Sequence, residues 1–349
     1  MSEHRSSSES HDSFNQHVVQ QLIDDLFPDN ISMNNPDYNR LYDNLKKWLS
    51  TTDIASMNEK AIQFNFYQNC MKVYNQQIGD TLKYVDDFNG IIYRDLFQRL
   101  MPDFCIVDHY NSHLKSLSSG LDLEFLPLHI VSIFELKKKL KDKDVGQLLH
   151  YLRIVLDYSP SSRTYIIGAI TDFHDIRYAK VSRSDNDDNV KYETASKVII
   201  NENEYLLHYL TKFLTTNTSQ FGYNRLEPLP KDIRIHDTLL GTGANSMVFN
   251  CLIDKHEPNQ YALKISNKPV NREVLIYKQL YGDKYNIVKV HEYALLFVHP
   301  PGRIISKQNL LNNVDIIWEH IKGAHKHNIL HRDIRKSNII EILNHQTKR

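Results

Sequence analysis

The spacing of apolar residues along the chain predicts where its helices and strands lie. Apolar residues recur every three or four positions in residues 18–27, 41–49 and 56–77, which predicts three amphipathic helices. From residue 102 onward, short apolar runs rich in β-branched residues predict strands, with helix-spaced stretches between and after them. We expect strands at residues 103–108, 129–137, 164–171 and 176–182, and helices at 145–158 and 204–214. Helices before, between and after strands predict an α/β (α+β) fold built on a mixed sheet.

A second pattern begins after an aperiodic stretch that contains glycine and two prolines. It predicts strands at 233–240, 246–253 and 261–266, a helix at 272–280, one or two strands over 286–298, and a long helix over 309–328. The expected organisation is an acidic, partly disordered tail with a short helix (1–37), a first domain (38–215), a linker (216–232) and a second domain (233–349).

Composition and charge narrow the class of protein. With 349 residues, 41% of them hydrophobic, and a mean hydropathy of -0.48, the chain is expected to be a soluble protein with more than one core. The sequence shows neither a signal peptide nor an apolar run of transmembrane length, so we expect an intracellular location, nucleus or cytoplasm, and no membrane partner. Three cysteines at unrelated spacings favour a reducing compartment over a disulfide framework. The 42 basic and 42 acidic residues cancel, but residues 1–37 carry one basic and seven acidic residues and residues 231–349 carry 18 and 11.

The first candidate site combines Asp103 with Glu135 and Lys137. Side chains at positions i and i+2 of a strand share a face, so Glu135 and Lys137 should project together. Carboxylates from two neighbouring strand ends form an oxygen-rich site suited to Mg²⁺ or Mn²⁺, and a nearby lysine can orient or deprotonate a water that attacks a phosphodiester. Gln147 and Tyr151 share one face of the following helix. The alternative is a turn at Asp103 and a solvated, charged strand edge at Glu135 and Lys137.

The residues Pro102-Asp103, Glu135-Leu136-Lys137 and Gln147…Tyr151 resemble the PD-(D/E)xK nuclease superfamily, especially its RecB-like and lambda-exonuclease-like branches, over roughly residues 40–215. The resemblance implies a restriction-endonuclease-like core in which Asp103 and Glu135 bind the metal and all five polar residues are catalytic. It also implies an acidic residue from the preceding helix, for which Glu59 is the best-placed candidate. The lysines from Lys137 to Lys143 either contact phosphate or are a solvated helix start.

The second candidate site lies in residues 233–349. Gly241 and Gly243 stand between two expected strands, Lys264 ends the third strand, and a His-Arg-Asp loop at 331–333 follows the long helix. Glycines let backbone N–H groups approach phosphates, a strand lysine neutralises them, and a loop aspartate accepts the proton of a substrate hydroxyl. This order of motifs resembles a eukaryotic-type protein kinase with a small lobe and part of the large lobe. The resemblance implies an ATP site formed by Gly241, Gly243, Ser246, Val248, Lys264 and Glu273, with Asp333 as catalytic base and Asn338 as a Mg²⁺ ligand.

Three features depart from the kinase pattern. Only nine residues lead from Lys264 to Glu273, so we expect a short helix or a shifted register. Arg335 stands where lysine is usual. The chain reaches Arg349 before an Asp-Phe-Gly motif, so we expect ATP binding with slow or absent phosphotransfer, and an exposed apolar face on the long helix around Ile316, Ile317, Trp318 and Ile321.

The two domains together resemble the carboxyl halves of Crinkler-type effectors, a family associated with host nuclei and DNA damage. The leading hypothesis is a metal-dependent nuclease acting on nucleic acid, DNA first of all, fused to a kinase-like ATP-binding module. One alternative is a protein kinase that transfers phosphate to a protein substrate, with the first domain as a scaffold. The other is a non-catalytic double pseudoenzyme that acts by interaction.

Overall fold

The computed structural model describes residues 36–78, 82–85, 101–108, 127–183, 190–198, 203–230, 232–243, 245–253, 261–282, 287–297, 302–330 and 334–341. The described residues form two compact units, one extending to Pro228 and the other beginning at Leu229. The helix expected over residues 18–27 lies outside the described residues.

The first unit is built on a six-stranded sheet in the order β1-β2-β3-β4-β5-β6. Its strands are β1 (Leu82–Val85), β2 (Phe104–Asp108), β3 (Ile130–Leu136), β4 (Tyr165–Thr171), β5 (Asp175–Arg183) and β6 (Val190–Val198). Neighbours pair antiparallel except β3 and β4, which are parallel. A parallel pair needs a crossover connection, and the helix α6 (Asp142–Tyr158) supplies it. The expected α/β (α+β) class with a mixed sheet is confirmed.

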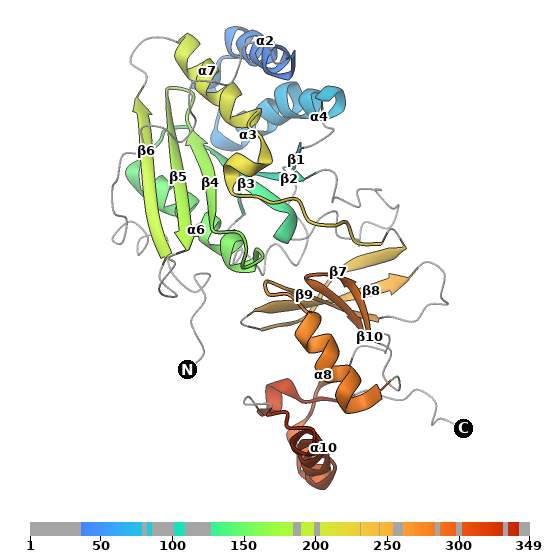
Figure 1. Ribbon diagram of the computed structural model, residues 1–349. Coiled ribbons are helices and arrows are strands. Elements are labelled where there is room, and N and C mark those ends of the chain that lie inside the picture. Colours follow the sequence, from blue (N-terminus) through green and yellow to red (C-terminus); the bar gives the residue numbers. More distant parts are fainter. Residues whose placement is uncertain are drawn as a thin grey trace, which may run out of the picture. The chain divides into compact units, whose positions relative to one another are not determined.

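Helices pack on both faces of this sheet (Figure 1). Besides α6, they are α2 (Pro36–Thr51), α3 (Glu59–Phe66), α4 (Lys72–Ile78) and α7 (Asn203–Leu214), with a π-helix at Tyr67–Met71 and 3₁₀ helices at Ile54–Ser56, Pro127–His129 and Thr218–Phe221. Helix α6 packs on β3, β4 and β5, whereas α2, α3 and α7 enclose the opposite face. The sheet is therefore buried on both sides over its central strands.

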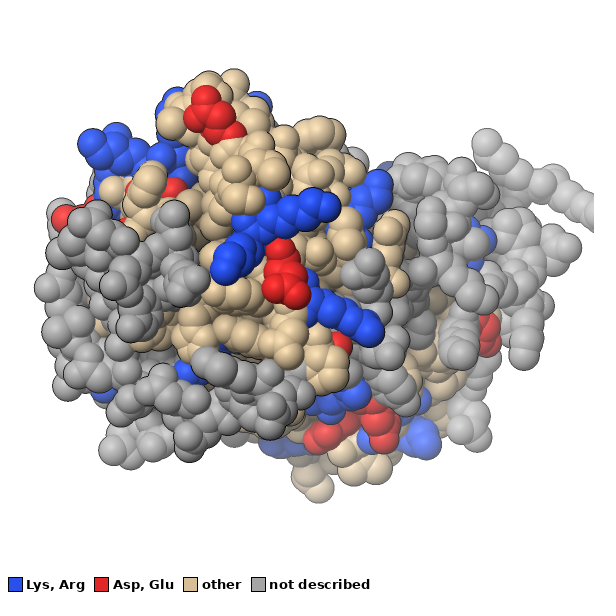
Figure 2. Space-filling model, turned by 90° about the horizontal axis from the view of Figure 1, so that it is seen from above, with Lys and Arg blue, Asp and Glu red and all other residues tan. Residues whose placement is uncertain are grey.

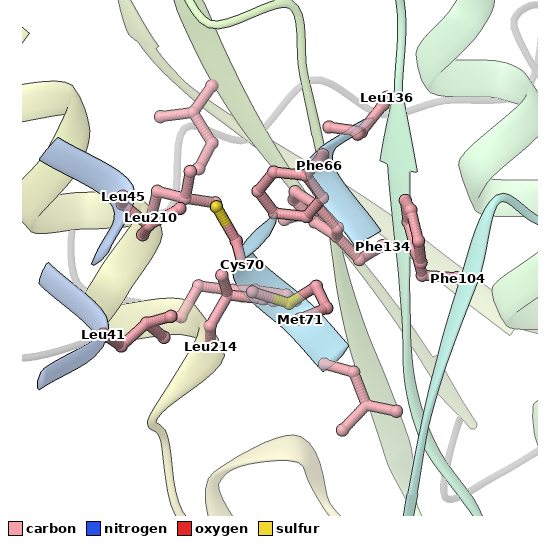
Figure 3. Packing of buried hydrophobic residues seen from close by; sticks show 14 of the residues in the cluster. Leu41, Leu45, Phe66, Cys70, Met71, Phe104, Phe134, Leu136, Leu210 and Leu214 are labelled. Atoms are coloured by element: carbon pink, nitrogen blue, oxygen red, sulfur yellow. The ribbon is translucent and has the colours of Figure 1, made fainter. Parts of the chain in front are cut away.

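Strand alternation assigns each side chain of β3 to one of these two layers. Phe134 and Leu136 enter a cluster with Phe66 and Phe104, shown in Figure 3. The rings of Phe66 and Phe104 lie 5.7 Å apart, edge to face. Glu135 points to the other face because it lies between Phe134 and Leu136. Apolar packing of its neighbours thus directs a carboxylate toward α6.

The π-helix at Tyr67–Met71 explains how residues 59–78 bury one stripe of side chains. Ile62, Phe66, Cys70 and Tyr74 are all buried and are spaced by four residues. An α-helix has about 3.6 residues per turn, so a four-residue spacing drifts around its axis. The wider π turn compensates for that drift, and such turns are frequent at functional sites.

The structure differs from the linker expected over residues 216–232, because the start of that range belongs to the first unit. Phe221 and Tyr223 are part of the buried cluster. Gly222 between them has a φ of 70°, and a Cβ there would lie 2.3 Å from the carbonyl oxygen of Tyr165. Only glycine allows this close approach, so residues 218–223 pack against β4 instead of spanning two domains.

The second unit contains a five-stranded antiparallel sheet in the order β10-β11-β9-β8-β7 and a two-stranded ladder of β12 and β13. The strands are β7 (Ile233–Thr242), β8 (Ser246–Ile253), β9 (Tyr261–Ser266), β10 (Ile287–His291), β11 (Ala294–Phe297), β12 (Arg303–Ile304) and β13 (Ile340–Glu341). The helices are α8 (Asn271–Tyr281), α9 (Lys307–Asn312) and α10 (Val314–Lys326).

The prediction of a single long helix over residues 309–328 was wrong, because Asn313 interrupts the helix. Asn313 has a φ of -121° and ψ of 18°, outside helical values. Its side-chain Nδ2 donates a hydrogen bond to the carbonyl oxygen of Asn309 at 2.7 Å. Such local bonds let asparagine compete with helix continuation.

The expected exposed apolar face on α10 is present. Ile316 and Trp318 are 57% and 53% exposed. Ile317 and Ile321 are half-buried. Among the residues that the structure describes, no helix combines the length and apolar character needed to cross a bilayer.

Candidate active site

Asp103, Glu135 and Lys137 meet where β2 begins and β3 ends. Phe104 pairs with Phe134 in an antiparallel register, which brings the residue before β2 next to the last residues of β3. The Lys137 Nζ lies 3.3 Å from Glu135 Oε2 and 3.8 Å from Asp103 Oδ2. The three residues that the sequence pattern singled out therefore form one cluster.

The two carboxylates are held by reciprocal hydrogen bonds to each other's strand. The backbone N–H of Asp103 donates to Glu135 Oε1 at 2.8 Å. The backbone N–H of Leu136 donates to Asp103 Oδ2, also at 2.8 Å. Each carboxylate thus receives a donor from the chain segment that carries the other one, so their relative position follows from the β2–β3 pairing.

The remaining residues expected in this site also converge on it. Glu59, the first residue of α3, places Oε1 3.5 Å from Lys137 Nζ and accepts a 3.4 Å bond from the backbone N–H of Lys138. From α6, Gln147 Nε2 donates to Glu135 Oε2 at 3.4 Å and to the Tyr151 hydroxyl at 2.9 Å. Side chains from α3 and α6, together with Lys137 at the end of β3, thus surround the carboxylates of Asp103 and Glu135.

Burial makes this site electrostatically unusual. The Glu135 side chain is fully buried, and that of Asp103 is 12% exposed. Burial, followed by repulsion from Asp103, raises the pKa of Glu135 well above its ordinary value. Burial also raises the pKa of Asp103 to about 6, although Lys137 and the Leu136 N–H oppose the shift. Both carboxyls therefore have a reduced tendency to ionise, and a nearby positive charge would favour their ionised forms.

Lys137 supplies such a charge. Burial alone would lower the pKa of Lys137, but the negative charges of Glu135, Asp103 and Glu59 outweigh it and hold the pKa above its ordinary value. The side chain is thus an ammonium at neutral pH. Of the two roles considered for this lysine, orienting a water fits the structure better than deprotonating one.

The donor set fits a hard divalent cation. Among the described residues, no three His, Cys, Asp or Glu side chains form a ready metal cage. Lys137 Nζ instead lies among the carboxylates of Glu59, Asp103 and Glu135. Mg²⁺ usually binds through one or two carboxylates plus waters and substrate phosphates. Asp103 and Glu135 meet that requirement, and a bound dication would relieve the repulsion between them.

Two further contacts at the site were not foreseen. Gln63 Nε2 donates to Asp103 Oδ1 at 2.7 Å. The backbone N–H of Lys137 donates to the carbonyl oxygen of Thr171, at the end of β4, at 2.9 Å. Gln63 follows Glu59 by four residues on α3, and that spacing is the one sequence signal that could have identified it.

In the second unit, the strand register brings together several of the residues expected to bind ATP. Gly241 on β7 is paired with Val248 on β8, which in turn pairs with Lys264 on β9. Directly opposed residues project from the same face of a sheet, so the Val248 and Lys264 side chains are neighbours. Ser246 begins β8, and its carbonyl oxygen accepts a 2.7 Å bond from the backbone N–H of Gly243.

Lys264 and Glu273 form an ion pair despite their short separation in sequence. Lys264 Nζ lies 2.7 Å from both Glu273 Oε1 and Glu273 Oε2. Glu273 is in the first turn of α8, which spans 11 residues. Asn338 ends a 3₁₀ helix at Lys336–Asn338 and is exposed. Asp333, the expected catalytic base, lies outside the described residues.

Basic and acidic side chains are interspersed on the face shown in Figure 2. Of the lysine run, Lys137 is buried in the site, whereas Lys138, Lys139, Lys141 and Lys143 are exposed. Comparisons of the sequence with protein-family models and with curated proteins found no match.

Proposed function

We propose that the first unit is a metal-dependent nuclease of the PD-(D/E)xK type, which hydrolyses phosphodiester bonds in nucleic acid. The observation that supports this most strongly is the clustering of Asp103, Glu135 and Lys137 at the adjoining ends of β2 and β3. Glu59, Gln147 and Tyr151 line the same cluster. A solvated strand edge would not bury two carboxylates against each other.

In this proposal Asp103 and Glu135 hold Mg²⁺ or Mn²⁺. When bound, the metal supplies a Lewis acid for the phosphoryl oxygens and a more acidic water. The ammonium of Lys137 orients the attacking water and stabilises negative charge at the phosphate. Gln147 holds Glu135 in place through its amide, and Tyr151 fixes the orientation of Gln147. Glu59 restrains Lys137 from the solvent side.

Replacing Lys137 with methionine is expected to lower the rate of nucleic-acid cleavage by at least about 10²-fold, because the site loses its only non-metal cation among the described residues. The measurement is cleavage of single- and double-stranded DNA and RNA by the full chain with Mg²⁺ or Mn²⁺. Lys139→Met removes the same charge two residues away, where the side chain is exposed, and serves as the matched control.

The two variants separate catalysis from general charge attraction. Equal losses in both would assign Lys137 to non-specific phosphate attraction. Undiminished cleavage by Lys137→Met would exclude it from the reaction, and failure of the full chain to cleave any of the four substrates would contradict the proposed function.

For the second unit we propose a kinase-like nucleotide-binding module that takes ATP. The Lys264–Glu273 ion pair, aligned with Val248 and Gly241 across three strands, favours this function. An ammonium held by one carboxylate is oriented to contact phosphate oxygens, and the exposed glycines leave the backbone accessible.

Replacing Lys264 with methionine is expected to weaken ATP binding by about tenfold or more, because one charge-assisted phosphate contact is lost. Isothermal titration calorimetry with ATP and Mg²⁺ measures the change. Lys268→Met, just beyond the same strand and exposed, is the control. If both variants bound ATP as tightly as the unaltered chain, Lys264 would not contribute to ATP binding.

The combination resembles Crinkler-type effectors, and we propose that nucleotide occupancy of the second unit regulates cleavage by the first. Titrating ATP into the cleavage reaction distinguishes this regulation from the two alternatives. A protein kinase with the first unit as a scaffold would transfer radiolabel from ATP to protein. A double pseudoenzyme would carry out neither reaction.

A further inference from the structure

Gln63 is an uncharged side chain at the candidate metal site that contacts Asp103 directly. Its Nε2 donates to Asp103 Oδ1 at 2.7 Å. The other oxygen of the same carboxylate, Oδ2, accepts from the Leu136 N–H at 2.8 Å. Asp103 is therefore held at both oxygens by donors from two elements, the helix α3 and the strand β3.

The position of Gln63 follows from the construction of α3. Asn58 caps the helix by accepting a 2.9 Å bond from the backbone N–H of Ala61. Buried Ile62 and Phe66 anchor the helix on the sheet. Glu59 and Gln63, one turn apart, then lie at the edge of that anchored face, where both reach the cluster. The packing of α3 thus fixes the amide before any ligand arrives.

The neutral amide has a specific advantage at this place. Lys137 Nζ is 3.8 Å from Asp103 Oδ2, and it also attracts Glu135 and Glu59. If only the Leu136 N–H held the Asp103 carboxylate, that carboxylate could rotate toward the ammonium. It would then no longer be oriented to bind the same cation as Glu135. Gln63 opposes the rotation without adding a positive charge that would repel a metal ion. Its hydrogen bond leaves the second lone pair of Oδ1 available for coordination.

We propose that Gln63 is a positioning residue of the metal site, which orients the Asp103 carboxylate for a divalent cation. The inference rests on the proposed nuclease function and assigns to that site a residue that the sequence motif does not contain. Gln63 acts through Asp103 and does not touch the reacting atoms. Hydrogen-bond partners of metal ligands typically contribute about 10–100-fold to metal affinity or activity.

The test compares Gln63→Met, which keeps the side-chain length and removes the donor, with Gln68→Met in the same helical segment. Gln68 is half-buried and accepts a bond from Lys72, so it controls for loss of a helix glutamine. Mn²⁺ binding by the full chain is measured by electron paramagnetic resonance, and cleavage is measured as a function of Mn²⁺ concentration. Gln63→Asn, whose amide is one methylene short of Asp103, is the second variant should Gln63→Met fail to fold.

We expect Gln63→Met to raise both the Mn²⁺ dissociation constant and the Mn²⁺ concentration for half-maximal cleavage by about 10–100-fold, with the rate largely restored at saturating metal. Gln63→Asn should move the same way by a smaller factor, and Gln68→Met should match the unaltered chain. Unchanged Mn²⁺ binding in Gln63→Met, or a rate that saturating metal does not restore, would overturn the positioning role. Absence of Mn²⁺ binding by the unaltered chain would instead refute the proposed function itself.

Discussion

Replacing Asp103 with asparagine is expected to abolish cleavage and at the same time stabilise the metal-free protein. Cleavage should fall by at least about 10³-fold, because one of the two metal-binding carboxylates loses its charge. The fold should tolerate the change, since asparagine keeps an oxygen for the Leu136 N–H and the Gln63 amide can turn over to accept from the new NH₂ group.

The gain in stability follows from proton linkage. The pKa of Asp103 is raised from 3.8 to about 6, with burial as the largest cause. Between those two pH values the native state binds more protons than the unfolded state, so the free energy of unfolding falls as pH rises. Above about pH 6 the penalty is complete, and removing it should add about 1–3 kcal/mol. Below about pH 4 the variant and the unaltered chain should be equally stable.

Calorimetric unfolding in the presence of a chelator, from pH 4 to pH 8, measures this difference for the first unit. Asp157→Asn neutralises a half-buried carboxylate on α6 that is already paired with Arg153, so it should retain cleavage and gain no stability. Added Mg²⁺ should raise the melting temperature of the unaltered chain more than that of Asp103→Asn. A variant that still cleaves, or one that is less stable than the unaltered chain at pH 8, would contradict this account.

Replacing Arg163 with methionine is expected to destabilise the first unit by about 3–5 kcal/mol. Arg163 is 3% exposed. It donates to the carbonyl oxygens of Ile130 and Val131 at 2.6 Å, and to those of Tyr165 and Phe221 at 3.3 and 3.2 Å. Burial lowers its pKa to about 9, so it stays charged at neutral pH. Methionine would leave these buried carbonyls without that donor.

Urea unfolding of the full chain measures the loss as a shift in the transition of the first unit. Arg163→Lys should recover only part of it, because an ammonium cannot serve the diverging carbonyls that the planar guanidinium reaches. Arg153→Met on α6 removes a partly exposed arginine with one ion pair and should cost less than about 1 kcal/mol. If Arg163→Met also cost less than 1 kcal/mol, the guanidinium would not be the group that holds these segments together.

Arg163 and Gln63 show why part of the structure was not predictable from sequence. Gln63 is 40 residues from Asp103, and Arg163 is more than 30 residues from the two β3 carbonyls that it binds. No local spacing relates such residues. The β3–β4 register begins at Phe134 and Ala169, so Arg163 supplies donors to β3 carbonyls that lie upstream of this ladder. Only the path of the strands shows that these β3 carbonyls require a donor from Arg163.

Strand β6 was missed for a different reason. Its residues Lys191 to Thr194 are mostly polar and include exposed or half-buried side chains, as expected for a strand at the edge of a sheet. A hydrophobic pattern of period two is weak under these conditions. The strand is defined instead by its antiparallel pairing with β5, from Arg183↔Val190 to Asp175↔Val198.

The sequence by itself determined the α/β class, most of the helices and strands, and the grouping of Asp103, Glu135, Lys137, Gln147 and Tyr151. The class, the elements and the pairs Glu135/Lys137 and Gln147/Tyr151 follow from the periods of helices and strands, which are local properties of the chain. The grouping of these pairs with Asp103 was expected from the resemblance to the PD-(D/E)xK motifs. Tertiary structure alone decided that two of these carboxyls resist ionisation, that Lys137 remains an ammonium, and that Gln63 holds Asp103. Desolvation and the distance between charges depend on which segments pack together, and no local pattern encodes that packing.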